Sequence, residues 1–591
     1  MDKRDMPLGI VCVLVLAWWM VSYGGCGKRP IDAATGNEPA PEAVAESVSA
    51  QESQNWKTAE LSLPKDLVAA AALSEPEVEP ELTAAVHHAD FETLDDVQTV
   101  TLESEFADYV VDPNAGGVIG ARLHAYRNEE RTDDMELGAI EFPILAVRAR
   151  EAASGWLFTK PRLEEQTKES VTFARGVIGH PLLVEQQVSL SPDAPYRLKY
   201  KLRVRNTGSQ RIDLGDLRLS CGAMAELGTA KGFMGAGGMD QRLDLMPAGK
   251  TKPKTYPIHK IAKLKAEKIE ELSTSEQQWV AVQNKYFASI VTPTGGFSGV
   301  ELTLRDAADE AESELIAGYG FLESRSLAGG EYTDWEFDVH LGPKIRDVLQ
   351  TMGQNQDRVM QFDLFMFFQF KWMEAISSLI FWLLLTFESY LPGYGWSIMA
   401  LTVLIRTIFW PVTHRATMLS RRMQAVAPEM KELKEKYKDD PQRMQEKTWE
   451  LYKTHKINPL AGCLPMVLQI PVFFALFNVL RNAIELRQES WLWVTDLSKP
   501  DTIATLGSIP LNPLAVTMGL SMFLQQYLTP STADPNQKKM MQFMTIGFMF
   551  MLYTMPSGLT LYWTVNNIIS IIQYRVTRAK PEGNDEQPAK S

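Results

Sequence analysis

Several polar side chains stand inside otherwise apolar stretches of this 591-residue sequence, and the most costly of them is an arginine. Arg406 lies within ALTVLIRTIFWPV, and an arginine at the centre of a bilayer costs about 2.5–3.5 kcal/mol on insertion scales. Val412 follows six residues later, about 9 Å away along a helix that rises 1.5 Å per residue, so the guanidinium could also snorkel to the bilayer surface. Thr402, one turn earlier on the same face, favours a polar interior site instead.

Other polar residues occur in the apolar stretches that follow. Gln469 lies between Pro465 and Pro471. The last apolar stretch carries a polar and aromatic set: Thr560, Tyr562, Trp563, Thr564, Asn566, Asn567 and Ser570. Polar groups on several membrane helices cost least when they share one wet cavity, although ordinary hydrogen bonds between helices would also satisfy Ser, Thr and Asn. The later apolar stretches contain no Asp or Glu, so the pattern favours passage of anionic or polar peptide over a proton or cation path.

Patterns of other chemistry are missing from the sequence. There is no complete Walker loop for binding nucleotide, and the eight histidines lack the spacing of metal ligands. Four cysteines, two of them in or beside apolar runs, imply no disulfide framework. A net charge of −14 argues against a nucleic-acid binder. We therefore expect no enzyme activity, no cofactor, no metal and no sequence recognition of nucleic acid.

The apolar stretches predict a multi-pass α-helical membrane protein. A helix needs about 20 residues to cross a bilayer. The predicted spans are an amino-terminal anchor in 1–26, followed by 394–412, 463–484, 512–528, 540–556 and 557–575. Pro556-Ser557-Gly558 divides the last long run, because proline ends a helix and glycine permits a reversal. The first run is slightly short, so a cleaved or lipidated signal remains an alternative.

One apolar run, Ala375–Phe387, is too short to span and is preceded by aromatic residues mixed with charges. We expect residues 354–390 to form an interfacial amphipathic helix. With six spans, both termini, the basic stretch 413–462 and the tail 576–591 lie in the cytoplasm, as the positive-inside tendency requires. A seventh span would put that basic stretch outside.

The region between the first two spans has two textures. Residues 27–96 are rich in Ala, Glu and Pro and predict a disordered acidic tether. Residues 97–345 alternate apolar and polar side chains, as in YRLKYKLRVRNTGS, where a half-buried strand ends at a turn. Many such strands with few helices predict a large extracytoplasmic β-sandwich.

Residues 413–462 predict a cytoplasmic helical hairpin. Met423, Val426, Met430, Leu433 and Tyr437 follow a heptad spacing. Asp440-Pro441 then supplies an N-cap and a first-turn proline for a second helix. The outer faces carry Lys431, Lys434, Lys438 and Arg443. These cations either form a solvated face that fixes the topology or dock a ribosome, a targeting factor or an emerging chain.

Several strings resemble the YidC family of bacterial membrane protein insertases, which is related to Oxa-type proteins. The most specific is NPLAGCLPMVLQIPVFFALF, from Asn458 to Phe477. GWSIMALTVLIRTIFWPVT and PSGLTLYWTVNNIISIIQ resemble the family's second and last spans, and WVAVQNKYFASIVTP resembles its outer β-domain. The resemblance covers almost the whole chain and is weakest in the tether. Two departures are Thr545, where the family often has proline, and a short, weakly basic carboxyl tail.

The resemblance implies a non-enzymatic insertase and chaperone of the inner membrane. It implies a cytosol-open groove that binds clients through Arg406, Thr402, Gln469, Trp563, Tyr562 and Asn567. Its expected partners are nascent integral membrane proteins, the Sec translocon, a ribosome or targeting factor, and membrane lipids. The family's outer domain is a β-sandwich and its helix before the second span lies along the outer leaflet, as expected here.

Overall fold

The structure is a computed structural model, and it describes most of the chain beyond the acidic stretch. The described residues are 98–138, 142–149, 157–192, 194–215, 217–224, 227, 241–261, 263–305, 315–365, 368–438, 440–455, 464–507, 509–528 and 535–579. Residues Val97–Ser591 form one compact unit. The predicted anchor in 1–26 and tether in 27–96 lie outside the described residues.

The larger layer of the β-domain is an antiparallel sheet with the order β13-β12-β14-β15-β19-β9-β8-β7-β6 among the described residues. The strands are β6 (Arg162–Gln166), β7 (Ser170–Gly176), β8 (Leu182–Leu190), β9 (Arg197–Asn206), β12 (Arg242–Pro247), β13 (Lys254–Pro257), β14 (Gln277–Gln283), β15 (Phe287–Pro293) and β19 (Tyr332–Pro343). Strand β9 buries every second residue, so its alternating sequence sets which face meets the core.

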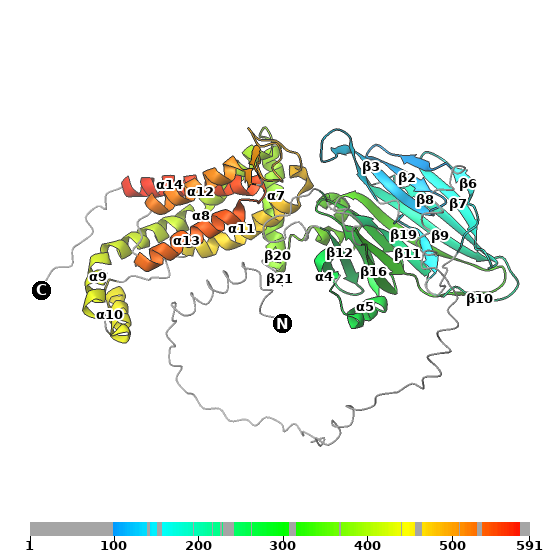
Figure 1. The fold of residues 1–591 in the computed structure, drawn as a ribbon, viewed down its shortest axis with the longest axis horizontal. Helices are drawn as coiled ribbons and strands as arrows, with labels where there is room; N and C mark the ends of the chain where they lie inside the picture. The colour runs from blue at the N-terminus through cyan, green and yellow to red at the C-terminus, as the bar shows by residue number, and fades with distance from the viewer. Residues whose placement is uncertain are drawn as a thin grey trace, which may run out of the picture. The chain divides into compact units, whose positions relative to one another are not determined.

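Two smaller antiparallel sheets accompany the large one (Figure 1). Their orders are β16-β17-β11-β5 and β1-β2-β3-β4. The strands are β1 (Val100–Glu103), β2 (Ala107–Asp112), β3 (Gly117–Arg127), β4 (Asp134–Leu137), β5 (Val147–Ala149), β11 (Leu217–Met224), β16 (Gly299–Arg305) and β17 (Leu315–Phe321). One apolar core joins side chains of all three sheets, including Tyr109, Leu219 and Val282. The predicted β-sandwich is confirmed.

Short elements complete this domain. A two-stranded pair joins β10 (Ile212–Asp213) to β18 (Ser326–Leu327). The polar stretch between β13 and β14 forms the short helices α4 (Ile258–Ile261) and α5 (Ala266–Ser273). Among its described residues, the domain is therefore rich in strands and contains only short helices, as its alternating sequence predicts.

Residues 346–365 and 368–370 precede the long helices, and their buried side chains up to Phe362 pack on the outer face of the large sheet. They form α6 (Arg346–Gln350), the 3₁₀ helix η2 (Gln356–Met360) and the pair β20 (Leu364–Phe365) and β21 (Phe368–Gln369). Trp279 Nε1 donates to the Gln354 carbonyl at 2.9 Å, and Arg242 Nη2 donates to the Val359 carbonyl at 2.7 Å. The helix predicted over 354–390 begins only at Lys371, because these contacts hold the residues around η2 against the sheet.

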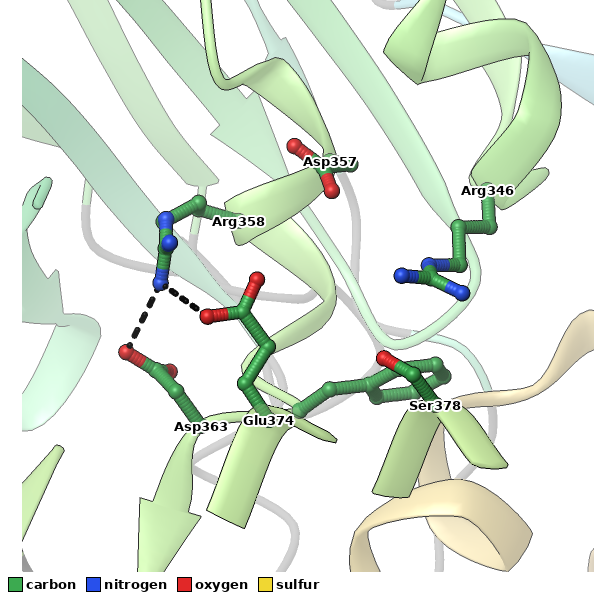
Figure 2. Close-up of a pocket in the computed structure, with 7 residues that line it drawn as sticks. Arg346, Asp357, Arg358, Asp363, Glu374 and Ser378 are labelled. Carbon is green, nitrogen blue, oxygen red and sulfur yellow. Dashed lines mark hydrogen bonds and ion pairs between the residues drawn. The ribbon is translucent and has the colours of Figure 1, made fainter. Parts of the chain in front are cut away.

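The shortened helix is α7 (Lys371–Glu388), and an ion-pair cluster fixes its first turn. Arg358 Nη1 lies 3.4 Å from Asp363 Oδ2 and 2.9 Å from Glu374 Oε2, and Figure 2 shows both carboxylates turned toward it. The neighbouring cavity encloses about 10 Å³, at most the volume of one water. We interpret this cluster as a structural joint between the β-domain and α7, because it has no room for a ligand.

The remaining long helices run alongside one another (Figure 1). They are α8 (Tyr394–Ala425), α11 (Leu464–Asn482), α12 (Pro513–Leu528), α13 (Pro535–Leu552) and α14 (Ser557–Ala579). Between α11 and α12 lie η4 (Ile484–Leu486) and the strand pair β22 (Ala504–Leu506) and β23 (Ile509–Leu511). Among the described residues, the stretch Tyr394–Met418 alone is both long and apolar enough to cross a membrane, and Gln542–Leu552 is a shorter apolar helix. The other expected spans stay predictions.

Two short helices follow α8 and pair with each other at its end (Figure 1). They are α9 (Ala427–Lys436) and α10 (Pro441–Thr454). The Asp440 side chain accepts a 3.0 Å hydrogen bond from the Arg443 N–H and so caps α10. Thr448 Oγ1 lies 3.8 Å from Met430 Sδ, which brings the two apolar seams together. Helix α8 continues to Ala425, so the first part of the 413–462 stretch extends that helix.

Candidate functional site

Helix α14 presents a row of polar side chains to its neighbours. Tyr562, Asn566 and Ser570 are spaced four residues apart, which puts them on one face of a helix with 3.6 residues per turn. Asn566 and Tyr562 are buried, and Ser570 is half-buried. This row faces α8 on one side and α11 on the other, because its side chains bind residues of both helices.

The guanidinium of Arg406 on α8 binds two members of this row, Asn566 and Ser570. Arg406 Nε donates to Asn566 Oδ1 at 2.6 Å, and Nη2 donates to the Asn566 carbonyl at 3.2 Å. Nη2 also donates to Ser570 Oγ. These contacts orient the planar guanidinium, whose donors lie in a fixed fork.

All of these acceptors are uncharged. Among the ion pairs of the described residues, none involves Arg406, and no bond of its Nη1 is present there either. Among the described residues, amide, carbonyl and hydroxyl groups hold this half-buried cation and no carboxylate pairs with it, so no counter-charge compensates it there. Such a group can attract an incoming anion more strongly than in water, since the surroundings have a low dielectric constant.

Thr402 lies one turn before Arg406, but its hydroxyl group bonds to the backbone of its own helix. Its side chain is fully buried, and Oγ1 donates to the Ile398 carbonyl at 2.7 Å. Thr402 and Arg406 therefore lie one turn apart on α8, as predicted. Among the described contacts, however, no bond joins their two side chains.

Gln469 on α11 and Tyr562 on α14 form a second polar contact. Gln469 Nε2 donates to the Tyr562 hydroxyl oxygen. Tyr562 is 1% exposed, whereas Gln469 is half-buried. The bond joins α11 to the same helix that binds Arg406, so α14 is the element on which the site is assembled.

The Gln469–Tyr562 bond makes a direct prediction for stability. Tyr562→Phe removes the acceptor with little change in volume and should lower the free energy of unfolding by about 0.6–1.7 kcal/mol, the range for hydrogen bonds between membrane helices. Gln469→Leu should cost a similar amount. The double variant should cost clearly less than the sum, as measured by unfolding in mild detergent. Strict additivity would show that the two side chains do not interact.

Trp563 sits in an aromatic cluster rather than beside Arg406. Its ring centroid lies 5.2 Å from that of Phe473 on α11 and 4.9 Å from that of Phe548 on α13. Asn567 turns to a third helix, where its Nδ2 donates to Ser521 Oγ of α12 at 2.9 Å. The structure therefore brings Gln469 and Tyr562 together, and places Trp563 and Asn567 at other contacts of α14.

Two contacts that support the site were not predicted from the sequence. Gln573 Nε2 donates to Thr413 Oγ1 at 2.7 Å, so α8 and α14 are joined again beyond Arg406. Asn566 and Ser570 are the partners of Arg406, although the sequence identified them only as members of a polar set. The four-residue spacing of Tyr562, Asn566 and Ser570 is the signal that could have separated them from Asn567.

The cations of the predicted docking hairpin can be placed in part. Lys431, Lys438 and Arg443 are exposed. Lys434 lies on α9, but the surroundings of its side chain lie outside what the structure describes. His455 Nε2 lies 3.1 Å from Glu429 Oε2, which joins the two arms near their open end.

Comparisons with known proteins match the chain over almost all of its described length. The model of the 60Kd inner membrane protein family matches residues 386–584, and that of the YidC periplasmic domain matches residues 100–383. The membrane protein insertase YidC of Citrifermentans bemidjiense is 33% identical over 418 residues, which cover 66% of this chain and 74% of that protein. The chain belongs to the YidC family.

Two further matches to YidC proteins complete this comparison. YidC of Endomicrobium trichonymphae is 37% identical over 324 residues, so the chain spans only 60% of the length of that relative. The crystal structure titled as an active YidC insertase with the first transmembrane domain resolved shares 18% identity, with 83% of this chain and 94% of that chain covered and a TM-score of 0.34. All six expected groove residues fall within the segment matched by the 60Kd family model.

Proposed function

We propose that this YidC-family protein inserts integral membrane proteins into the inner membrane and helps them fold, without enzyme activity. The carrying observation is the guanidinium of Arg406, which is held by neutral groups of α14 and has no carboxylate partner among the described residues. In this proposal it is the positive centre of a hydrophilic groove that opens to the cytosol and to lipid.

The groove would lower the barrier to moving a polar flank of the client across the membrane. The hydrocarbon core is about 30 Å thick, and a water-filled half-channel shortens the dry distance. Nη1 of Arg406 is the donor that the contacts with Asn566 and Ser570 leave for a client carboxylate. A charge-assisted hydrogen bond of this kind is worth about 1.5–3 kcal/mol.

The client's apolar segment would then move along apolar helix faces into lipid. Exposed large apolar side chains of α12 and α13 supply such a surface: Leu520, Phe523, Leu524, Tyr527, Phe543, Met544, Ile546 and Phe550. Methionine adapts to varied partners, and six methionines occur between Met540 and Met555. The driving force is hydrophobic partitioning together with the membrane potential.

The proposed topology has six spans, with both termini in the cytoplasm and the β-domain in the periplasm. The cations Lys431, Lys438 and Arg443 are exposed on α9, α10 and their connection, as expected for a segment on the cytoplasmic side. We propose the same hairpin as the docking site for a ribosome or targeting factor. The Sec translocon, with which some clients would be inserted, and membrane lipids are the other proposed partners.

Photocrosslinking to a stalled nascent membrane protein tests this function. A photoreactive residue at Gln469 or Trp563 should form crosslinks with a client that carries acidic residues in its translocated flank. Thr402 is fully buried, so crosslinks from that position should be weaker. Ile408 is the control, because it is 60% exposed and lies about 200° around α8 from Arg406. Crosslinks no stronger from Gln469 than from Ile408 would contradict the proposal.

A further inference from the structure

The connection between α11 and η4 continues into a segment that contacts the β-domain. This segment, residues 483–501, meets the turn between β3 and β4, residues 128–133, which we call the hairpin tip. The two are more than 350 residues apart in the chain, so their contact forms only in the tertiary structure.

A three-residue ion cluster lies at the centre of the contact. Glu129 of the hairpin tip binds Lys499 Nζ, and its other oxygen lies 3.4 Å from Arg487 Nη2. The Arg487 side chain is 2% exposed. Burial alone would raise the pKa of Glu129, but the hydrogen bond and charge of Lys499 together with Arg487 hold that pKa below its usual value. The carboxylate therefore stays ionised at neutral pH, and its contribution is lost only as the pH falls below the usual carboxyl range.

Hydrogen bonds to backbone carbonyls surround this cluster. Gln488 Nε2 donates to the Asn128 carbonyl at 2.7 Å, and Arg487 Nη1 donates to the Arg127 carbonyl at 2.7 Å. In the other direction, Arg131 Nη2 donates to the Thr495 carbonyl at 2.5 Å and the Gln488 carbonyl at 3.2 Å. Each side thus recognises the backbone shape of the other.

Backbone conformation and apolar packing also support a specific contact between the segment and the β-domain. Arg131 and Gln488, which bind each other, have φ values of 63° and 64°. Residues other than glycine rarely adopt this left-handed conformation unless their surroundings hold them in it. Ile484 is 1% exposed and belongs to the apolar core of the β-domain. The 483–501 segment is therefore anchored in the β-domain by both polar and apolar groups.

The same segment also binds the first turn of α14. Ser557 N donates to the Lys499 carbonyl at 2.8 Å, and Gly558 N donates to the Leu497 carbonyl at 2.9 Å. Ser557 Oγ also donates to the Asp496 carbonyl at 3.0 Å. These bonds satisfy N–H groups that a helix leaves unpaired at its amino end.

The segment also reaches the start of α8. The Trp491 ring lies 5.9 Å from the Trp396 ring, measured between centroids. A Cβ atom on Gly395 would come within 2.2 Å of the Trp491 side chain, so the two elements are in close contact. The segment therefore touches the amino ends of both helices that carry the Arg406 site.

We propose that the 483–501 segment is a clamp through which the β-domain holds the outer ends of α8 and α14 together, with the Glu129 cluster as its lock. The consequence for the groove rests on the proposed function: the clamp keeps the groove closed to the periplasm while clients enter from the cytosol. When the hairpin tip is released, the segment keeps the Ile484 contact and the 3.1 Å bond from Lys285 Nζ to the Ser498 carbonyl but loses the polar contacts near Lys499, so the first turn of α14 becomes accessible from outside.

The test measures access to that turn in the full-length protein. A cysteine replaces Thr560, which is 1% exposed, in a background without the native cysteines. A membrane-impermeant maleimide is added from the periplasmic side of spheroplasts. Glu129→Gln should raise the labelling rate about tenfold, because a buried guanidinium loses its counter-charge, and Lys499→Gln should act in the same direction. The double variant should label no faster than the faster single variant.

Glu130→Gln is the matched control, because Glu130 is the exposed neighbour of Glu129 and has no bond to the segment among the described residues. Arg131→Ala is a second variant, because it removes the bonds to the Thr495 and Gln488 carbonyls and leaves the ion pairs of Glu129 in place. The clamp proposal would be overturned if Thr560→Cys were labelled no faster in Glu129→Gln and in this second variant than in the Glu130→Gln control. The assay needs no client, so a clamp that responds while Arg406 variants insert normally would refute the proposed function alone.

Discussion

Replacing Arg406 with alanine should slow the insertion of clients that have acidic translocated flanks by roughly 10- to 100-fold. A charge-assisted hydrogen bond is worth about 1.5–3 kcal/mol, and each 1.36 kcal/mol is a factor of ten in rate. Clients with uncharged flanks should change little. Protease protection of a radiolabelled client in vesicles measures both classes. Arg422→Ala is the control, because Arg422 is exposed on the same helix.

Arg406→Lys should retain much of the activity, because it keeps the positive charge. The loss that remains has a structural cause: an ammonium group cannot match the fork that binds Asn566 Oδ1, the Asn566 carbonyl and Ser570 Oγ together. Equal and complete loss in Arg406→Ala and Arg406→Lys would contradict a role based on charge.

Asn566→Asp tests whether insertion needs the uncompensated positive charge of Arg406 or only the presence of its side chain. The substitution is nearly isosteric and puts a carboxylate where Arg406 Nε now meets an amide oxygen at 2.6 Å. The guanidinium stays in place but is neutralised, so acidic clients should insert as poorly as with Arg406→Ala. Normal insertion of acidic clients by this variant would show that the free charge is not what they bind.

Trp563→Ala should destabilise the helix assembly by about 2–4 kcal/mol, somewhat below the 3–5 kcal/mol typical of large aromatic residues in a full core. The Trp563 ring packs against Phe473 and Phe548, so its loss removes contacts of α14 with α11 and α13 together. Unfolding in mild detergent measures the effect, and the variant should also accumulate less protein.

Trp563→Tyr is the informative companion to that variant. A tyrosine ring keeps an aromatic edge for Phe473 and Phe548, so most of the stability should return. If instead insertion fails with Trp563→Tyr at full stability, the indole has a direct role toward the client that packing does not explain.

The β-domain was predictable because apolar and polar residues alternate along its strands, and this alternation sets which face of each strand is buried. In β9, the residues Leu198, Tyr200, Leu202 and Val204 are buried and their neighbours are more exposed. A shift by one residue would turn the whole set to solvent, so the pattern specifies one arrangement. The order of the strands depends on contacts far apart in the chain and could not be derived in this way.

Proline and glycine mark the start of the last helix correctly, whereas α8 runs through Pro411 to Ala425, beyond the predicted limit at residue 412. Helix α14 begins at Ser557, directly after Pro556, as the sequence indicates. The prediction of a helix from residue 354 was wrong, because Asn355 and Gln361 adopt positive φ at the two ends of η2 and the residues around η2 pack on the large sheet. Tertiary packing overrides the local helical pattern there.

The composition of the candidate site was predictable, but its pairings were not. The sequence singled out Arg406 because of its cost in an apolar run, yet the rotation of α14 decides whether Asn566 or Asn567 faces it. The structure gives Asn566 to Arg406 and Asn567 to Ser521. The Glu129 cluster was likewise beyond sequence reasoning, because its members lie in separate regions with no shared pattern.

The proposed insertion mechanism requires that water reach Arg406 from the inner side of the membrane, and a single cysteine can report this access. Ser570→Cys is nearly isosteric and puts a thiol against the guanidinium, whereas Ile568→Cys, on another face of α14, is the control. We predict that an impermeant thiol reagent on the cytosolic side labels position 570 much faster than position 568, and that a stalled nascent client blocks this labelling. Equal, slow labelling at both positions with no effect of the client would contradict the account.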